Sequence, residues 1–455
     1  MESEVHALRE ENARLRARVA DLEALVERLC ARIEILEKQL AGKPGGPPPA
    51  ALERMPESAP KPRGRPKGHP GTSWSLPAVP PEVIELRLTD CPECGGPLSR
   101  WHDFQDHVVV DIPAAIAPLV TNYRHERRYC RRCRKTVRAP GVADEPPHGH
   151  LGLRLLALAA ELKSGVGIPF TKISGLLQRL FQVRVPRSTL PALVGRVSQW
   201  LVPTHRALLR TIAAAPVKHA DETSWPVDGK NGWAWAFATA DAVAFVMEPT
   251  RGAIVPKTIL GTPAAGVLVC DDYSAYRSLP HEQQACWAHL LNEAKVVAGV
   301  THQPAAIRMR QHLRGIYAEA EIVAAARDTL SPRVLEQEIA RIDALLVNAC
   351  RGRSKVSEVT HLKKRVKRRR HALLTFLHRP GVEPTNNRGE RVIRPLVLVR
   401  KVSGGSRSWD GARAHGILAS CLQSLAHLKA SFDDLVRNHV TLPHRRPPLL
   451  SILPT

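Results

Sequence analysis

The sequence predicts a multidomain α+β protein, and three regularities along the chain support that prediction. Apolar residues recur at heptad spacing over residues 1–41, which is typical of a coiled coil. They recur at helical spacing over residues 150–215. From residue 216 onward, short runs rich in β-branched and aromatic residues alternate with helical patterns, which indicates a mixed α/β core.

The composition limits the classes of function. The 455 residues include 66 Lys and Arg against 43 Asp and Glu, and the net charge of +23 favours a polyanionic partner such as nucleic acid. Aromatic residues make up only 4% of the chain, so double-stranded DNA fits better than stacked single strands. The chain has no apolar run near the roughly 20 residues of a membrane span and no signal peptide pattern, so we expect a soluble intracellular protein.

Residues 1–41 carry a leucine-zipper pattern. The two core positions of the heptad are held by Val5, Asn12, Val19, Val26, Ile33 and Leu40, and by Leu8, Leu15, Leu22, Leu29 and Leu36. β-branched residues at the first position with Leu at the second favour a parallel dimer, whose register Asn12 fixes. Opposite charges such as Glu4 and Arg9 would face each other across that dimer, so we expect self-association. The alternative is an amphipathic helix that lies on its own chain.

Residues 42–81 form a Pro/Gly-rich basic linker that cannot pack a core. Within it, the segment 61–68 resembles an AT-hook, a motif whose Arg-Gly-Arg-Pro centre lies in the minor groove of DNA. Arg63, Arg65 and Lys67 are the expected contacts, because a narrow A·T minor groove concentrates negative potential. The alternative is a solvated basic linker.

Residues 82–140 contain two Cys-x-x-Cys pairs, formed by Cys91, Cys94, Cys130 and Cys133. Four thiolates suit a tetrahedral Zn²⁺ with a structural role, which predicts a zinc ribbon. Its strands are expected at Val108–Ile112 and Leu119–Tyr123. Two disulfides, or unrelated thiols, are the alternatives.

The region 150–215 is predicted to be helical and to contain a helix-turn-helix. We expect Phe170–Phe181 as the first helix and Gln182–Pro186 as the turn. The second helix would then begin at the segment 187–190 with Ser188 as its N-cap. The residues placed to meet the major groove are Arg187, Ser188 and Thr189. The alternative is an ordinary helical hairpin without a role in DNA reading.

Residues 216–289 have the pattern of the first part of an RNase-H-like mixed α/β core. A helix is expected at Ile254–Leu260, between three antiparallel strands and two further ones. The expected strands are Pro216–Asp221, Trp233–Thr239, Val243–Met247, Gly266–Asp271 and Gln283–Trp287.

Acidic residues fall where these strands end. Asp221 is expected to end the first strand, and Asp271 or Asp272 the fourth; periodicity does not decide between these two. If the strands are neighbours, two carboxylates meet at one edge. Glu390 is the candidate for a third carboxylate, in the first turn of a short helix. The alternative for Glu390 is a capping box with Asn387 as the N-cap.

A helical insertion is expected at residues 290–380, followed by the second part of the core with C-terminal helices at 381–440 and a tail at 441–455. The insertion holds a dense basic block, for which we favour contact with DNA over a solvated charged face. The block consists of Lys363, Lys364, Arg365, Lys367, Arg368, Arg369 and Arg370.

Several motifs together resemble the transposases of the IS-sixty-six insertion-sequence family. They are the zipper, Gly68–Gly71, the Cys pairs, Asp221-Glu222-Thr223, Asp271 with Tyr273 and Tyr276, Cys286-Trp287-Ala288-His289, and Asn386-Asn387 followed by Glu390-Arg391 and Arg394-Pro395. The resemblance implies a DDE-type enzyme with an RNase-H-like catalytic domain, in which Asp221, Asp271 and Glu390 are the acidic triad. It thereby selects Asp271 over Asp272.

The resemblance implies metal-dependent cleavage at transposon ends and strand transfer into target DNA. Carboxylate oxygens suit Mg²⁺ or Mn²⁺. Arg391 and Arg394 would contact DNA beside Glu390, and we interpret Trp287 and His289 as core or site-supporting residues. The family also implies accessory proteins of the element and a location with the bacterial nucleoid in the cytoplasm. The alternatives are a metal-dependent nuclease without strand transfer, and a DNA-binding regulator that has lost catalysis.

Overall fold

A computed structural model describes residues 83–98, 116–142, 145–147, 149–261 and 266–441. The chain divides into two compact units, Met1–Asp111 and Ile112–Thr455. The predicted coiled coil, the linker with Arg63, Arg65 and Lys67, and the tail from residue 442 lie outside the described residues, as does the strand expected at 108–112.

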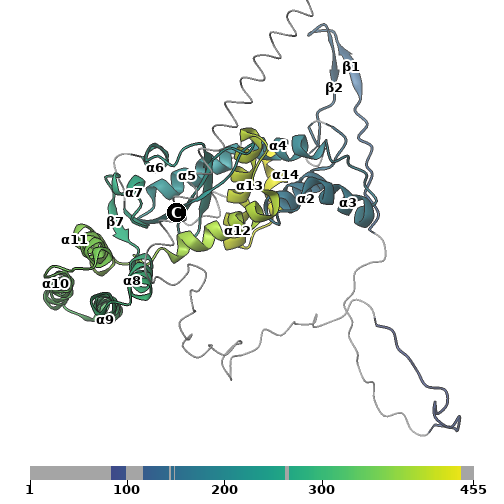
Figure 1. Ribbon diagram of the computed structural model, residues 1–455. Helices are drawn as coiled ribbons and strands as arrows, with labels where there is room; N and C mark the ends of the chain where they lie inside the picture. The colour runs from purple at the N-terminus through teal and green to yellow at the C-terminus, as the bar shows by residue number, and fades with distance from the viewer. Residues whose placement is uncertain (1–82, 99–115, 143–144, 148, 262–265, 442–455) are drawn as a thin grey trace, which may run out of the picture. The chain divides into compact units, whose positions relative to one another are not determined.

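The centre of the second unit is a five-stranded mixed sheet (Figure 1). The strand order is β5-β4-β3-β6-β7, in which β3, β4 and β5 are antiparallel neighbours and β6 and β7 run parallel to β3. This order confirms the predicted series of three antiparallel strands, a helix and two more strands. The strands are β3 (Val217–Ser224), β4 (Trp233–Ala238), β5 (Val243–Glu248), β6 (Val267–Cys270) and β7 (Glu282–Ala285).

Helices cover both faces of the sheet, because alternate residues of the strands are apolar on each side. One face packs against α5 (Val202–Ala214), α6 (Ile254–Leu260) and α7 (Ser274–Arg277). Over β4 and β5, the other face packs against α12 (Asn387–Ser403) and α13 (Trp409–Leu428). The helix predicted at 254–260 is therefore confirmed, and α12 lies on the sheet face toward which Asp221 alternates.

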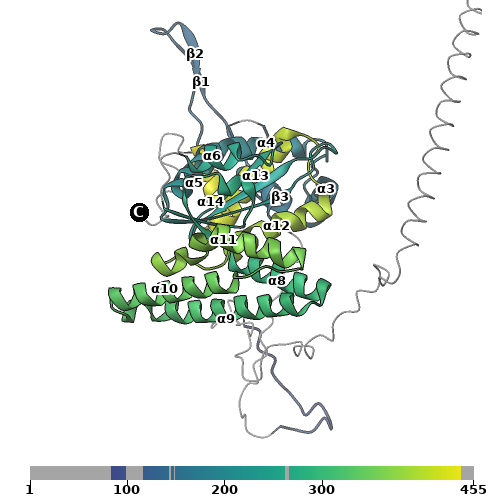
Figure 2. The ribbon, with the colours of Figure 1, turned by 60° about the vertical axis from the view of Figure 1, so that its left-hand side comes forward.

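Residues 287–378 are helical, and their helices lie together along one side of the second unit (Figure 2). They pack against β6 and β7. The helices share one apolar cluster with buried side chains of the two strands, so the insertion is anchored to the sheet. They are α8 (Trp287–Thr301), α9 (Pro304–Ala326), a 3₁₀ turn at Arg327–Thr329, α10 (Pro332–Ala349) and α11 (Ser357–His378).

A separate apolar cluster joins the helices before the sheet to those at the end of the chain. Its helices are α2 (Leu153–Ser164), α3 (Phe170–Phe181), α4 (Leu190–Trp200), part of α13, and α14 (Phe432–Thr441). The bounds of α3 confirm the first helix of the predicted pair. Ser188 as the N-cap of the second is wrong, because residues 187–189 form a turn and α4 starts at Leu190 behind Thr189.

A two-stranded hairpin carries the second Cys pair. It consists of β1 (Arg127–Cys130) and β2 (Lys135–Arg138), with Cys130 paired to Lys135 across the turn. The strand expected at Leu119–Tyr123 is not formed: Leu119 and Val120 are 94% and 87% exposed. Among the described residues no strand pairs with this segment, and strand-forming residues alone do not make a sheet.

Candidate active site

Two of the predicted carboxylates lie near each other, Asp221 within β3 and Asp271 directly after β6. The parallel register of β3 and β6 pairs His219 with Val269, and continuing it by two residues puts Asp221 opposite Asp271. Neighbouring strands are about 4.8 Å apart, so the two residues are adjacent. The expectation that Asp221 ends its strand is wrong, because β3 continues to Ser224 through pairing with β4. β6, in contrast, ends at Cys270, directly before Asp271.

The third carboxylate is brought to the same place by Asn386, the buried residue that precedes α12. Its side-chain amide donates to the carbonyl of Ala220 at 2.8 Å and its oxygen lies 3.1 Å from His219 Nδ1. Its backbone N–H donates to Cys286 Sγ at 3.1 Å. Because Ala220 precedes Asp221, these contacts fix the first turn of α12, and with it Glu390, beside the strand that carries Asp221.

The neighbouring Gly389 allows this attachment. A Cβ at this position would lie 2.7 Å from both terminal atoms of the Asn386 amide, closer than side chains approach each other. The capping box considered for Glu390 is wrong, because Asn386 rather than Asn387 precedes the helix and no side chain caps it. Sequence reasoning recognised the Asn-Asn motif but missed the roles of Asn386 and Gly389.

The electrostatics of Asp221 agree with this convergence. Burial, followed by the charges of Glu222, Asp271 and Glu390, raises the pKa of Asp221 from 3.8 to about 7, against a hydrogen bond from the Glu222 backbone N–H that lowers it. The charges of the other two triad carboxylates thus act on the first. Burial and the neighbouring carboxylates together disfavour the charged form of Asp221.

Glu222 points away from Asp221 and has hydrogen-bond partners of its own. Its carboxylate accepts hydrogen bonds from Arg251 at 2.6 Å and from the Tyr276 hydroxyl at 2.5 Å, and its side chain is 2% exposed. The guanidinium of Arg251 in turn lies over the rings of Trp233 and Tyr273. Burial raises the pKa of Glu222, while both hydrogen bonds lower it. This arrangement holds β3 behind Asp221 and was not foreseen from the sequence.

The structure also separates Asp271 from Asp272. Asp272 forms ion pairs with Arg365 at 3.2 Å, Arg368 at 2.7 Å and Arg369 at 3.2 Å, so its carboxylate serves to hold α11. Asp271 Oδ1 accepts one hydrogen bond, from a backbone N–H two residues on. The carboxylate that faces Asp221 is therefore Asp271, the choice implied by the family resemblance.

The same ion pairs reduce the number of residues in the basic block on α11 that have no protein partner and could contact DNA. Besides the three arginines tied to the strand end, Lys363 donates to a backbone carbonyl at 2.9 Å and Arg370 pairs with Asp343 at 2.8 Å. Lys364 and Lys367 are exposed, and so is Arg368. Ion pairs of the block tie α11 to the sheet, while contact of these three exposed residues with DNA stays a prediction.

The other predicted DNA contacts are placed on the surface. Arg187, Ser188 and Thr189 are exposed in the turn before α4. Arg391 and Arg394 are exposed on α12, directly after the triad glutamate. Their exposure is compatible with DNA contact, which stays a prediction.

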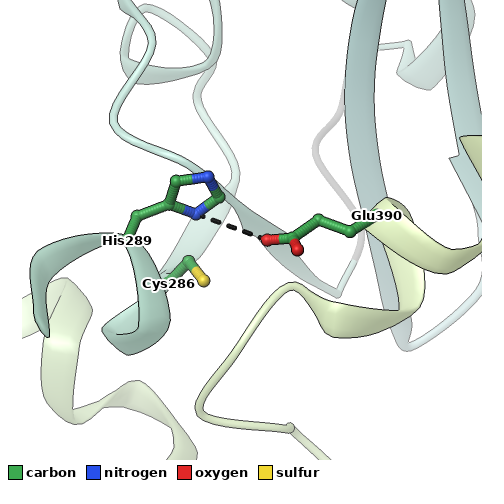
Figure 3. A group of neighbouring side chains, drawn as sticks. All are labelled: Cys286, His289 and Glu390. Atoms are coloured by element: carbon green, nitrogen blue, oxygen red, sulfur yellow. Dashed lines mark ion pairs between the residues drawn. The ribbon is translucent and has the colours of Figure 1, made fainter. Parts of the chain in front are cut away.

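The Cys-Trp-Ala-His motif opens α8 next to the triad. Trp287 is fully buried and its indole N–H donates to the carbonyl of Leu373 at 2.7 Å, so this residue belongs to the core. His289 Nδ1 lies 3.7 Å from Glu390 Oε1, with Cys286 beside both (Figure 3). Cys286 and then Glu390 raise the pKa of His289 to about 9.

Each predicted zinc-binding pair forms a tight turn of its own. In the first unit, the N–H of Gly95 donates to the carbonyl of Cys91 at 2.8 Å, and hydrogen bonds led by that of Cys94 lower the pKa of the Cys91 thiol. In the second, the N–H of Cys133 donates to Cys130 Sγ at 3.4 Å and lowers the pKa of that thiol. Both turns favour the thiolate form that zinc binds. The pairs lie in different units, so their joint site stays a prediction.

Comparison with known proteins adds the family. A model described as Transposase IS66 family matches residues 148–414, which is more than half of the chain. This chain belongs to the IS66 transposase family. Membership confirms the resemblance noted in the sequence.

A relative from Sinorhizobium fredii (strain NBRC 101917 / NGR234), named uncharacterized protein y4qI, is 28% identical over 315 residues. These residues are 60% of this IS66 family chain and 56% of the relative, so the chain spans a little over half of that protein. In the described part of the chain, none of the helices has the length and apolarity needed to cross a bilayer.

Proposed function

We propose that this IS66 family chain is a DDE-type transposase, which cuts DNA at the ends of its element and joins the freed ends to target DNA. The observation that carries the proposal is the placement of Asp221, Asp271 and Glu390 from β3, the end of β6 and α12 at one edge of the sheet. The strand order supports the expected RNase-H-like core. Family membership supports the reaction class.

The donor set fits a divalent metal. Asp221, Asp271 and Glu390 would hold it, because they offer carboxylate oxygens, the ligands that Mg²⁺ and Mn²⁺ prefer. The pKa of Asp221 is raised by burial first and then by the neighbouring carboxylates, and a bound cation would offset both effects. When bound, such ions supply charge stabilisation for the attacking and leaving oxygens of an in-line phosphoryl displacement.

The chain's own residues supply position and charge. Asn386 holds the helix of Glu390, and the hydrogen bonds of Glu222 hold the strand of Asp221. Arg394 follows Glu390 by four residues on α12, so both lie on one face of the helix and the guanidinium can meet the phosphate next to the scissile one. The exposed Lys364 and Lys367 extend positive charge along α11.

No protein nucleophile is needed for this chemistry. In the first step, the oxygen of water forms a bond to phosphorus and the 3′ oxygen of the cut strand leaves as a hydroxyl. In the second step, that 3′-hydroxyl forms a bond to a target phosphorus and the target's own 3′ oxygen leaves. Each step exchanges one P–O bond for another, so no external energy source is required.

Two features of the sequence complete the proposal. The four cysteines at 91, 94, 130 and 133 would hold a structural Zn²⁺, for which the turns around each pair are suited. Self-association would follow from the zipper at 1–41, and the turn at 187–189 would contact DNA ahead of α4.

The test incubates the purified full chain with labelled duplexes taken from both flanks of its coding gene, with Mg²⁺ and a supercoiled second plasmid. We expect Mg²⁺-dependent cuts and sequenced junctions between cut 3′ ends and plasmid DNA. Asp271→Asn should lose both, while Asp241→Asn, an exposed loop carboxylate, should retain both.

Other outcomes would refute parts of the proposal. Metal-dependent cuts without junctions would indicate a nuclease. Binding of the flanks without cuts by the wild type would indicate a regulator. Equal cutting by wild type and Asp271→Asn would exclude the triad.

A further inference from the structure

A second group of ligand atoms adjoins the triad at the start of α8. Cys286, His289 and Glu390 each present one ligand atom, and these atoms all lie within 4.8 Å of one another (Figure 3). We propose that Cys286, His289 and Glu390 form a Zn²⁺ site, which is distinct from the predicted cysteine ribbon and shares Glu390 with the proposed Mg²⁺ site. The proposal stands on this geometry and does not depend on the transposase reaction.

The separation of the ligand atoms fits a shared ion better than a direct contact. His289 Nδ1 is 3.7 Å from Glu390 Oε1, beyond the 2.7 to 3.2 Å range typical of a hydrogen bond. Zinc bonds of roughly 2.0 to 2.3 Å in a tetrahedron place two ligand atoms about 3.3 to 3.6 Å apart. His289 Nδ1 is also buried without a hydrogen bond of normal geometry among the described residues. A metal bound there would take the place of the proton that Cys286 and Glu390 favour.

Cys286 is placed to present its sulfur to a metal. It is 3% exposed and occupies the N-cap position of α8, where the helix dipole favours negative charge. Its sulfur accepts a hydrogen bond from the Asn386 backbone N–H at 3.1 Å. A donor of this kind orients a ligating group from outside the metal's own shell. The residue that places Glu390 therefore also places Cys286.

The ligand types select the ion. Thiolate with imidazole and one carboxylate suits zinc, whereas Mg²⁺ requires an octahedral set of oxygens. Three protein ligands leave a fourth position open. The side chains of His289 and Glu390 are each 42% exposed, so water or a phosphate oxygen can reach it. Only Oε1 of Glu390 is committed here, which leaves Oε2 for the triad, and a bound zinc would fix the orientation of this carboxylate.

The test measures zinc bound to the full chain after dialysis against a weak chelator. We expect Cys286→Ser and His289→Gln each to hold one zinc per chain fewer than wild type. Cys350→Ser removes a buried thiol from the end of α10, outside the cluster, and should keep the wild-type amount. Cys91→Ser should lose only the zinc of the predicted ribbon. Titration of the metal-free chain with Co²⁺ should give a thiolate charge-transfer band that weakens in Cys286→Ser.

Unchanged zinc content in both Cys286→Ser and His289→Gln would overturn the proposal and reduce the cluster to an ion pair of His289 with Glu390. If Cys286→Ser does not fold, His289→Gln and Glu390→Gln decide, because both residues are half exposed; wild-type zinc content in both overturns the site as well. Asp271→Asn separates this site from the reaction. This variant should not cut DNA but should keep the zinc. The zinc content therefore tests the Zn²⁺ site, and the cleavage assay separately tests the proposed function.

Discussion

Replacement of Asp221 by Asn is expected to stabilise the metal-free protein at pH 8 while it abolishes DNA cleavage. Asn keeps the shape of the side chain and can still accept the 2.9 Å hydrogen bond from the Glu222 backbone N–H. What it removes is a negative charge that burial and three neighbouring carboxylates disfavour. Stored electrostatic repulsion of this kind is the usual cost of a metal site without its metal.

The size of the effect follows from the pKa. The pKa of Asp221 rises from 3.8 to about 7. At about 1.4 kcal/mol per pKa unit, the gain in folding free energy on removal of this charge has an upper limit near 4 kcal/mol. Solvent reaches part of the carboxylate, so we expect about 2 kcal/mol, or about 4 °C in Tm. Because the folded pKa is raised, the wild-type penalty is absent below pH 4, grows between pH 4 and 7, and is complete above pH 7. The stability of Asp221→Asn relative to wild type therefore increases over the same pH range.

The assay is thermal and urea unfolding of both proteins in EDTA from pH 5 to pH 8.5, with Asp241→Asn as the control for loss of a surface charge. Mg²⁺ should stabilise the wild type more than Asp221→Asn and so reduce their difference. A variant less stable than wild type at pH 8 in EDTA, or a difference that does not change with pH, would refute the reasoning.

Three further predictions concern the supports of the site. Asn386→Ala should lower the free energy of unfolding by about 2 to 4 kcal/mol, because buried donors and acceptors lose partners, whereas the exposed Asn387→Ala should change it by under about 0.5 kcal/mol in urea unfolding. Asp272→Asn should destabilise by about 1 to 3 kcal/mol and increase amide exchange in α11, since it leaves buried arginine charge unpaired; unchanged exchange would contradict this. Lys364→Ala with Lys367→Ala should weaken DNA binding at low salt and reduce the salt slope by about two, measured by fluorescence anisotropy; an unchanged slope would exclude phosphate contacts there.

Much of this architecture is determined locally. Helices at 170–181 and 254–260 and the five strands of the core follow from apolar periodicity, which depends only on residues near in sequence. The failures are local too. Leu119–Tyr123 has strand-forming residues but pairs with no strand among the described residues. Ser188 has a capping side chain but lies in the turn, one residue before the N-cap Thr189.

What the tertiary structure decided is which charges meet. The sequence presented Asp271 and Asp272 as equals, and only the position of α11 shows that Asp272 is bound by arginines while Asp271 faces Asp221. The basic block is predicted to contact DNA from its charge alone. Only the tertiary structure shows that its arginines form ion pairs with Asp272 and Asp343 from other segments. Coulomb interactions act over a few ångströms in space and are indifferent to separation along the chain.

The sequence by itself therefore determined the elements, their order and the residue types available for metal and DNA. It could not determine that Asn386 joins α12 to β3, or that Glu390 lies between Asp221 on one side and the pair Cys286 and His289 on the other. Those relations join residues more than a hundred positions apart. They arise only when the sheet and its helices have packed, because hydrogen bonds and shared ligands require contact rather than pattern.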